Sequence, residues 1–163
     1  MEELETTDDF VIIRKKDLIL KLRSLGAGVE EADETRIALL EAAYFADRGV
    51  LPMDKEALLK RALKKDNLAR EKYAVIKQLR DAGYIVRPSL DGTPFLRLHR
   101  KGLRPGEDKT YYLIDVVPKG WKAGIEALMP ALETAGKLRK ELAVAVVDGE
   151  KVAFIKFARM NFE

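Results

Sequence analysis

One run of six residues near the C-terminal end limits the possible folds of this chain more than any other stretch. Residues 142–147 read LAVAVV, and a charged residue stands on each side of the run. A wholly aliphatic run of this length is typical of a β-strand buried on both faces, which needs packed layers on either side of its sheet. Asp148-Gly149 follows as a hairpin turn signal, and Val152–Phe157 is the predicted returning strand. The sequence therefore predicts a layered α/β domain around a central sheet.

Turn residues and apolar spacing predict the other elements of this half. A helix is expected at Leu68–Gly83 and a strand at Tyr84–Arg87. Two further strands are expected within Pro94–Val117, joined by a loop rich in Gly, Pro and charged residues. The last helix is expected at Ile125–Leu138, with Pro130 in its first turn or at a kink.

The N-terminal half shows a different mixture of short apolar runs and helical spacing. Phe10–Arg14 suits a strand, and Leu18–Leu22 suits a strand or a strand that turns into a helix. Apolar residues recur at helical spacing through Thr35–Asp47, which is expected to form a helix that ends at Gly49. Asp54 is expected to cap the helix that follows.

The charged run KKDN at residues 64–67 marks the expected boundary between two domains. Residues 1–66 are predicted to form an α+β N-terminal module, and residues 67–163 a C-terminal α/β sandwich with a central mixed sheet. The fold class is therefore predicted to be α/β.

Composition narrows the function classes. The chain of 163 residues has no cysteine, which excludes disulfides and thiolate metal sites. Its N-terminal stretch MEELETTDD is neither a signal nor a transit peptide, and no apolar run is long enough to span a bilayer, so the cytoplasm is expected. The net charge of +3, from 30 basic and 27 acidic residues, permits nucleic-acid binding without requiring it.

Basic residues concentrate around the loop between the two central strands. Such a cluster can follow RNA phosphates without reading bases, and it can equally be a solvated loop. The candidate RNA-binding residues are Arg97, Arg100, Lys101, Arg104 and Lys109.

Several motifs together resemble a known family. YAVIKQLRDAGYIV (residues 73–86), PFLRL (94–98), YYLIDVVP (111–118) and LRKELAVAVVD (138–148) resemble the C-terminal domain of the archaeal tRNA-splicing endonucleases. LLEAAYFADRGVL (39–51) is similar to an element of that family's N-terminal domain. The resemblance implies RNA binding and tRNA processing, with cleavage of precursor tRNA introns at bulge-helix-bulge sites. It also implies that neither metal nor cofactor takes part.

Family members use a Tyr as general base on the 2′-hydroxyl, a His as general acid and a Lys that stabilises the transition state. The resemblance places these roles at Leu98, Lys109 and Lys140 of this chain. Leucine cannot accept a proton, and a lysine with a pKa of about 10.4 is a poor substitute for imidazole. A shift of one residue in the alignment places His99, the only histidine, at the Tyr position and still leaves no acid. Only Lys140 is retained.

The resemblance therefore implies a structural, non-catalytic subunit of a heterotetramer that pairs two such chains with two catalytic subunits. In the family an acidic hairpin enters a basic groove of the opposing subunit, and Asp148 and Glu150 occupy its place here. The segment 154–162 resembles the strand through which family subunits dimerise. The expected interface residues are Asp148, Glu150, Phe154, Ile155, Phe157, Met160 and Phe162.

Further interpretations stay open. The acidic hairpin can be a solvated turn, and the C-terminal strand an internal sheet edge. The chain can also be an active endonuclease that uses Lys140 with Tyr111 or His99, or a homodimeric RNA-binding module on a nuclease fold.

Overall fold

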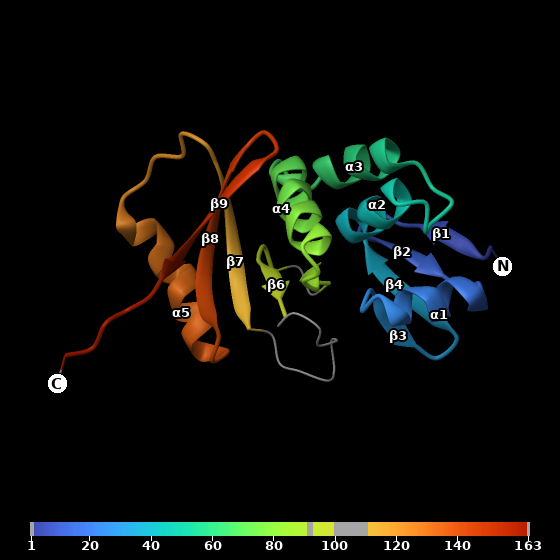
Figure 1. Ribbon diagram of the computed structural model, residues 1–163, viewed down its shortest axis with the longest axis horizontal. Helices are drawn as coiled ribbons and strands as arrows, with labels where there is room; N and C mark the ends of the chain where they lie inside the picture. The colour runs from blue at the N-terminus through green and yellow to red at the C-terminus, as the bar shows by residue number, and fades with distance from the viewer. Residues whose placement is uncertain (1, 91–92, 100–110, 163) are drawn as a thin grey trace.

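The computed structural model describes residues 2–90, 93–99 and 111–162. Within these residues the chain forms two β-sheets, and helices pack on both. Figure 1 shows the N-terminal sheet at one end of the molecule and the C-terminal sheet at the other, with α4 (Ala69–Asp81) between them. The predicted α/β fold class is confirmed.

The N-terminal sheet has four antiparallel strands in the order β1-β2-β4-β3. Its interior face carries Val11, Ile13 and Ile37, which are fully buried. The elements of this half are β1 (Leu4–Thr6), β2 (Phe10–Ile13), α1 (Lys16–Ser24), β3 (Val29–Glu31), β4 (Glu34–Ala38), α2 (Leu39–Asp47) and α3 (Lys55–Leu63).

The helix predicted at Thr35–Asp47 is wrong in its first four residues, because they belong to β4. Thr35 and Ile37 are buried while Arg36 between them is not, which is the two-residue alternation of a strand. Both buried residues are β-branched and pair with β2 at Ile13 and Val11. The spacing of Ile37 fitted a helix only because the true helix begins immediately after the strand, at residue 39.

The C-terminal sheet is mixed, with five strands in the order β5-β6-β7-β8-β9. The β7–β8 pair is parallel and its neighbours are antiparallel. A single 3₁₀ turn, η1 (Ile125–Leu128), leads into α5, whose first turn holds Pro130 as predicted. The elements are β5 (Val86–Pro88), β6 (Leu96–Leu98), β7 (Tyr112–Pro118), α5 (Met129–Lys137), β8 (Glu141–Asp148) and β9 (Lys151–Phe157).

Strand β8 is covered on both faces, as its aliphatic run predicted. Ala143 and Ala145 belong to the larger buried cluster, which α4 shares, whereas Leu142 belongs to a smaller cluster with Ala131 and Ala135 of α5. Alternate residues of the strand therefore pack against two different layers. Figure 1 shows α4 and α5 on either side of the sheet.

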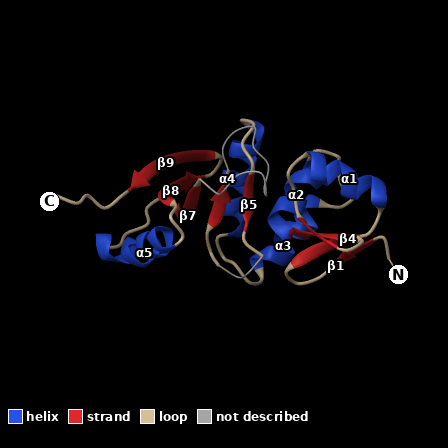
Figure 2. Cartoon of the chain, turned by 90° about the horizontal axis from the view of Figure 1, so that it is seen from below, coloured by secondary structure: helices blue, strands red, loops and turns tan. Residues whose placement is uncertain are grey.

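Strand β9 is the outer edge of this sheet, as Figure 2 shows. It ends at Phe157, as predicted for the returning strand Val152–Phe157, so the last residues of the segment 154–162 lie beyond the strand. The reason is the length of its neighbour: β8 begins at Glu141, and Phe157 pairs with Leu142. Beyond Ala158 no β8 residue remains to accept or donate ladder hydrogen bonds.

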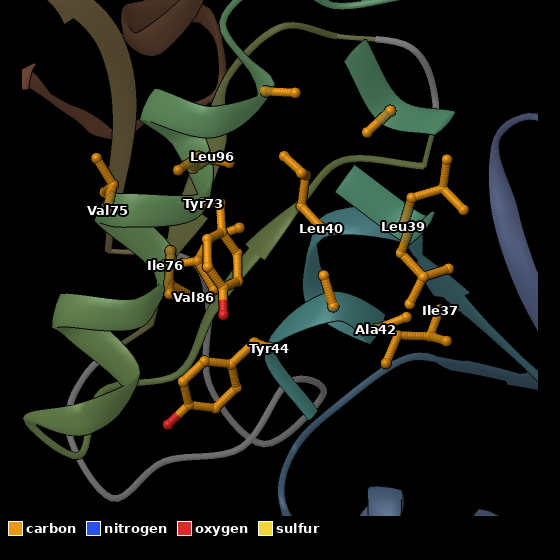
Figure 3. Packing of buried hydrophobic residues seen from close by; sticks show 14 of the residues in the cluster. Ile37, Leu39, Leu40, Ala42, Tyr44, Tyr73, Val75, Ile76, Val86 and Leu96 are labelled. Carbon is orange, nitrogen blue, oxygen red and sulfur yellow. The ribbon is translucent and has the colours of Figure 1, made fainter. Parts of the chain in front are cut away.

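The larger buried cluster runs from the N-terminal sheet through α2 and α4 to the C-terminal sheet. Figure 3 shows Leu40 of α2 facing Tyr73 and Ile76 of α4, with Val86 behind them. The predicted domain boundary at residues 66/67 falls in the connection between α3 and α4, beneath which this cluster is continuous. The division into two domains stays a prediction.

A buried ion pair joins the two halves. Glu41 of α2 is 2% exposed, and its carboxylate lies 2.8 Å from the Arg80 guanidinium of α4. The same guanidinium donates to the carbonyls of Leu25 and Gly26 at 2.7 and 3.2 Å, and it lies 5.3 Å from the centroid of the Phe45 ring. Burial raises the pKa of Glu41 against the opposing charge of Arg80, and burial lowers the pKa of Arg80.

No helix in the described part of the chain is both long enough and apolar enough to cross a membrane.

Candidate functional site

At one end of the C-terminal sheet, the last residue of β6 lies beside the first residues of β7 and β8. The register aligns Leu98 of β6 with Tyr112 of β7, and Tyr112 with Glu141 of β8. The backbone N–H of Tyr111 donates to the carbonyl of Leu98 at 2.7 Å, so the hydrogen bonds between β6 and β7 extend one residue before the start of β7. Two of the positions that the resemblance assigns to catalytic residues, Leu98 and Lys140, lie at this end of the sheet.

Leu98, which the resemblance places at the position of the general base, is half-buried and packs against the larger cluster. It pairs with Val86, which is fully buried under α4. An aliphatic side chain offers no proton acceptor to a substrate.

His99 is 7% exposed, and its backbone N–H donates to the carbonyl of Ile85 at 2.9 Å. Lys109 lies outside the described residues.

Tyr112 takes part in a partly exposed hydrogen-bonded network beside Leu98. The Tyr112 hydroxyl is hydrogen-bonded to Tyr111 and to the carboxylate of Glu141, which forms an ion pair with Lys156 at 2.8 Å. The hydrogen bond to Tyr111, burial and Glu141 raise the pKa of Tyr112. A tyrosine with a raised pKa is a poor proton acceptor near neutral pH. The network therefore favours a structural role for Tyr112.

Lys140 lines a groove of about 450 Å³ between α5 and the end of β9, called the α5–β9 groove below. Its floor is apolar, formed by Leu132, Leu142 and Phe157. Lys140 is half-buried and shares the groove with Lys137. The sequence singled out Lys140 alone. Lys137 stands three residues before it, in the last turn of the helix predicted at Ile125–Leu138, and this closeness in sequence was the available signal.

Arg159 is the third cation of the groove and lies beyond the end of β9. The predicted β8–β9 hairpin brings the chain back toward Lys140, but Arg159 lies beyond the predicted strand Val152–Phe157, where no sequence signal indicated its position.

The turn before Lys140 adopts a left-handed conformation at Arg139, with φ of 56°. The N–H of Arg139 donates to the carbonyl of Gly136, and the N–H of Lys140 to that of Ala135, at 3.1 and 2.8 Å. This paired ending of a helix usually holds glycine at the left-handed position. Here a non-glycine residue directs the chain from α5 into β8 so that Lys140 reaches the groove.

The predicted acidic hairpin is present and exposed. Asp148 ends β8, Gly149 has φ of 61°, and Glu150 follows in the turn. Asp148 pairs with Lys119 at 3.2 Å, and both side chains are mostly exposed. Gly149 and Glu150 also border a cavity of about 390 Å³ against α3 and α4.

Most of the predicted interface residues at the C-terminal end are exposed. Phe154 and Ile155 project from opposite faces of β9 and are 40% and 55% exposed. Met160 and Phe162 follow the strand and are 73% and 87% exposed. Phe157 differs, because it is half-buried against the smaller cluster and faces the α5–β9 groove.

Of the candidate RNA-binding residues, only Arg97 lies in the described part of the chain. It is half-buried in β6, opposite Leu113 of β7 and Arg87 of β5. Arg100, Lys101, Arg104 and Lys109 lie outside the described residues. Among the residues that the structure describes, no group of His, Cys, Asp and Glu side chains could hold a metal ion.

The chain is similar to known proteins over most of its length. A family model described as tRNA intron endonuclease, catalytic C-terminal domain, matches residues 69–154, from the start of α4 into β9. A tRNA-splicing endonuclease of Thermococcus onnurineus is 31% identical over 134 residues, which are 74% of this chain and 77% of that protein. One of Pyrococcus abyssi is 30% identical over 157 residues, which are 88% of this chain and 90% of that protein.

A longer relative shows the same similarity over part of its length. The tRNA-splicing endonuclease of Methanosarcina mazei is 27% identical over 148 residues, which are 85% of this chain and only 41% of that protein. The family match covers more than half of the chain, and the two shorter relatives match it over 74% and 88% of its length. The chain therefore belongs to the tRNA intron endonuclease family.

Proposed function

We propose that this chain is the structural, non-catalytic subunit of a heteromeric tRNA-splicing endonuclease. In this proposal it assembles with a catalytic subunit, as two chains of each, and the complex cleaves precursor tRNA introns at bulge-helix-bulge sites. The observation that carries the proposal is Leu98. The position that the resemblance assigns to the general base holds a half-buried aliphatic side chain that packs against the core, and the neighbouring Tyr112 is hydrogen-bonded to Glu141.

The exposed surfaces support the assembly part of the proposal. Asp148 and Glu150 form an acidic tip on a tight turn, which can enter a cationic groove at a small cost in ordering. Phe154 and Ile155 leave both faces of an edge strand apolar and exposed. An edge of this kind is an aggregation hazard unless another chain covers it.

A second candidate, an active endonuclease with altered residues, has one observation in its favour. Continuing the β6–β7–β8 register by one residue places His99, Tyr111 and Lys140 side by side on adjacent strands. The burial of His99 weighs against this candidate, because a catalytic acid or base must reach the RNA. A third candidate, a homodimeric RNA-binding module, rests on the fold alone.

A mixing series tests the proposal. A fixed amount of a catalytic-type subunit from the same source receives increasing amounts of this chain, and cleavage of a bulge-helix-bulge RNA is followed without added metal. The proposal expects activity to rise and to level off at an equimolar ratio. Activity that is independent of this chain contradicts the proposal.

Two further arms separate the second and third candidates. Cleavage by this chain alone that Lys140→Ala abolishes would favour the active endonuclease. Salt-dependent RNA binding by a homodimer, with no effect on cleavage by the catalytic subunit, would favour the binding module.

A further inference from the structure

A hollow of about 380 Å³ lies where α2 meets the C-terminal ends of α1 and α4, and it is called the α1–α4 hollow below. The positions that the resemblance assigns to catalysis do not line it. Its volume is in the range of small-ligand sites. The lining includes Leu25 after α1, Tyr44 and Phe45 of α2, Arg80 of α4, and Tyr84 and Ile85 beyond α4.

The floor of the hollow is aromatic and its walls are partly exposed. Tyr44 and Phe45 are buried, and their rings meet edge to face with centroids 5.2 Å apart. Leu25, Tyr84 and Ile85 are half-buried, so part of their apolar surface borders the open space. A flat apolar body that enters the hollow buries this surface, which stabilises the bound state.

The polar groups of Tyr44 and Arg80 are engaged by the chain itself. The Tyr44 hydroxyl, which points away from Leu40 in Figure 3, donates to the Asp81 carboxylate at 2.8 Å. The terminal nitrogens of Arg80 donate to two carbonyls of the turn after α1 and to the carboxylate of Glu41, which offsets the guanidinium charge. The hollow is therefore better suited to an uncharged flat group than to a phosphate or a carboxylate.

The hollow lies at the same end of the C-terminal sheet as Lys140. The carbonyl of Ile85, which lines the hollow, accepts the N–H of His99 at 2.9 Å. The register, continued by one residue, aligns Ile85, His99, Tyr111 and Lys140 on neighbouring strands. Neighbouring strands are about 4.8 Å apart, so about three such spacings separate Ile85 from Lys140. A single strand of RNA that runs along this end of the sheet passes both.

A nucleobase has the shape and polarity that the hollow favours. It is flat and uncharged at neutral pH, and unpaired RNA bases stack on aromatic side chains. A bulge-helix-bulge RNA offers such bases, because a bulged nucleotide has no pairing partner and turns out of the helix at a smaller cost than a paired one.

We propose that the α1–α4 hollow binds one nucleobase of the precursor tRNA, taken from an unpaired nucleotide of a bulge. The base lies against Leu25, Tyr84 and Ile85, over the floor formed by Tyr44 and Phe45. This inference rests on the proposed function, because it takes precursor tRNA as the RNA that the complex receives. It makes this chain a reader of the bulge as well as a support for the catalytic subunit.

A double-mutant cycle between chain and RNA tests the hollow. The probe is a fluorescein-labelled bulge-helix-bulge RNA, intact or with an abasic nucleotide at one bulge position at a time, and its anisotropy gives Kd for the full chain, alone and mixed with the catalytic subunit. Loss of a stack between a base and an aromatic ring weakens binding about 5- to 150-fold. At one bulge position, the abasic RNA is expected to show this loss with the unchanged chain and no further loss with Tyr84→Ala.

Tyr84→Phe keeps the ring and is expected to bind intact RNA like the unchanged chain. Losses from the abasic nucleotide and from Tyr84→Ala that simply multiply at every bulge position overturn the proposal, because the two groups then do not meet.

A blocking variant tests the hollow without removing a half-buried side chain. Ser24 lines the hollow and is exposed, so Ser24→Trp places an indole there and is expected to weaken binding of intact RNA to the level of the abasic RNA. Leu20→Trp is the matched control, because Leu20 is 57% exposed on the same helix and does not line the hollow. Unchanged binding in Ser24→Trp, or an equal loss in Leu20→Trp, overturns the proposal.

A free nucleotide carries the same base and is a separate source of it. The four nucleoside monophosphates are titrated into the ¹⁵N-labelled chain, and the amide resonances of Gly83 and Ile85 are followed. Only weak, unsaturated shifts are expected, since a lone nucleotide lacks the phosphate contacts of the RNA strand. Saturation at micromolar concentration, together with equal binding of intact and abasic RNA, overturns the assignment to precursor tRNA.

Failure of the hollow and failure of the proposed function are distinguishable. Cleavage that depends on this chain, without coupling between Tyr84 and any bulge base, rejects the hollow and keeps the structural subunit. Coupling without any effect of this chain on cleavage keeps the base site and rejects the subunit.

Discussion

Replacing Arg80 by methionine is expected to destabilise the protein far more than the loss of an exposed arginine. The substitution leaves the carboxylate of Glu41, 2% exposed, without its cation, and it also removes the donors to the carbonyls of Leu25 and Gly26. Breaking a buried ion pair by removing one partner costs about 3–5 kcal/mol. Equilibrium unfolding in guanidinium chloride at pH 7, followed by far-UV circular dichroism, measures the difference in free energy of unfolding.

Arg70→Met is the matched control on the same helix. Arg70 pairs with Glu56 at 3.1 Å, but both side chains are about half exposed, so solvent screens the pair and little change is expected. The double variant Glu41→Gln/Arg80→Met is expected to recover part of the loss, because it removes the buried charge. The reasoning is refuted if Arg80→Met and Arg70→Met unfold at the same denaturant concentration.

The free energy of unfolding of the Arg80→Met variant is also expected to depend on pH, in a direction that the pKa of Glu41 sets. Burial raises the pKa of Glu41, and the variant removes the largest opposing charge, although that of Arg87 remains. The folded state then keeps a proton that the unfolded chain, with a glutamate pKa of about 4.3, releases. The contribution of the protonated Glu41 side chain to the stability of the variant is therefore fully present below about pH 4.3. This contribution is lost as the pH rises toward the folded pKa of Glu41, by up to about 1.4 kcal/mol per pH unit.

Comparing Arg80→Met with Glu41→Gln/Arg80→Met between pH 4.5 and 7 isolates this effect, because every other titrating group is shared. A constant difference between the two variants across that range contradicts the assigned cause.

Three further predictions concern assembly and local structure. Ile155→Lys is expected to abolish association with the catalytic subunit in native mass spectrometry, since this side chain is 55% exposed on the edge strand and the subunit itself stays folded; a complex of unchanged mass rejects the interface. Asp148→Ala with Glu150→Ala is expected to weaken the tetramer, seen as a smaller mass on a sizing column at low concentration, and unchanged elution counts against the acidic tip. Asp54→Ala is expected to lower the free energy of unfolding by about 1 kcal/mol, because the carboxylate accepts the N–H of Ala57 at 3.2 Å at the start of α3; equal stability by chemical denaturation shows that the cap contributes nothing.

Patterns among neighbouring residues correctly predicted several structural features of the chain. The aliphatic run of β8, the Asp148-Gly149 turn and the cap at Asp54 each appear where they were expected. These features depend on neighbouring residues, so the sequence displays them directly. The β4 strand was missed because four of its five residues pair with β2, and distant pairing overrode the local helical spacing around Ile37.

The site could be predicted only in part, for a similar reason. Motif order placed Leu98 and Lys140 at the ends of central strands, where the structure finds them. Arg159 comes near Lys140 through the β8–β9 hairpin, which the Asp148-Gly149 turn indicated, but Arg159 itself lies beyond the predicted strand, where no local pattern indicated its position. The pair Glu41–Arg80 was missed as well, although a lone carboxylate inside the apolar stretch LLEAAYF was a signal that a buried partner had to exist.

Cleavage of a bulge-helix-bulge RNA by this chain alone tests the central claim most directly. The assay uses single-turnover conditions without added metal, with the purified chain in excess over labelled RNA, and a catalytic-type subunit is then added to the same reaction. Our account predicts no product above the RNA blank until the second subunit is present. Product formed by the chain alone, and lost in Lys140→Ala, would contradict the account and place an active site around His99, Tyr111 and Lys140.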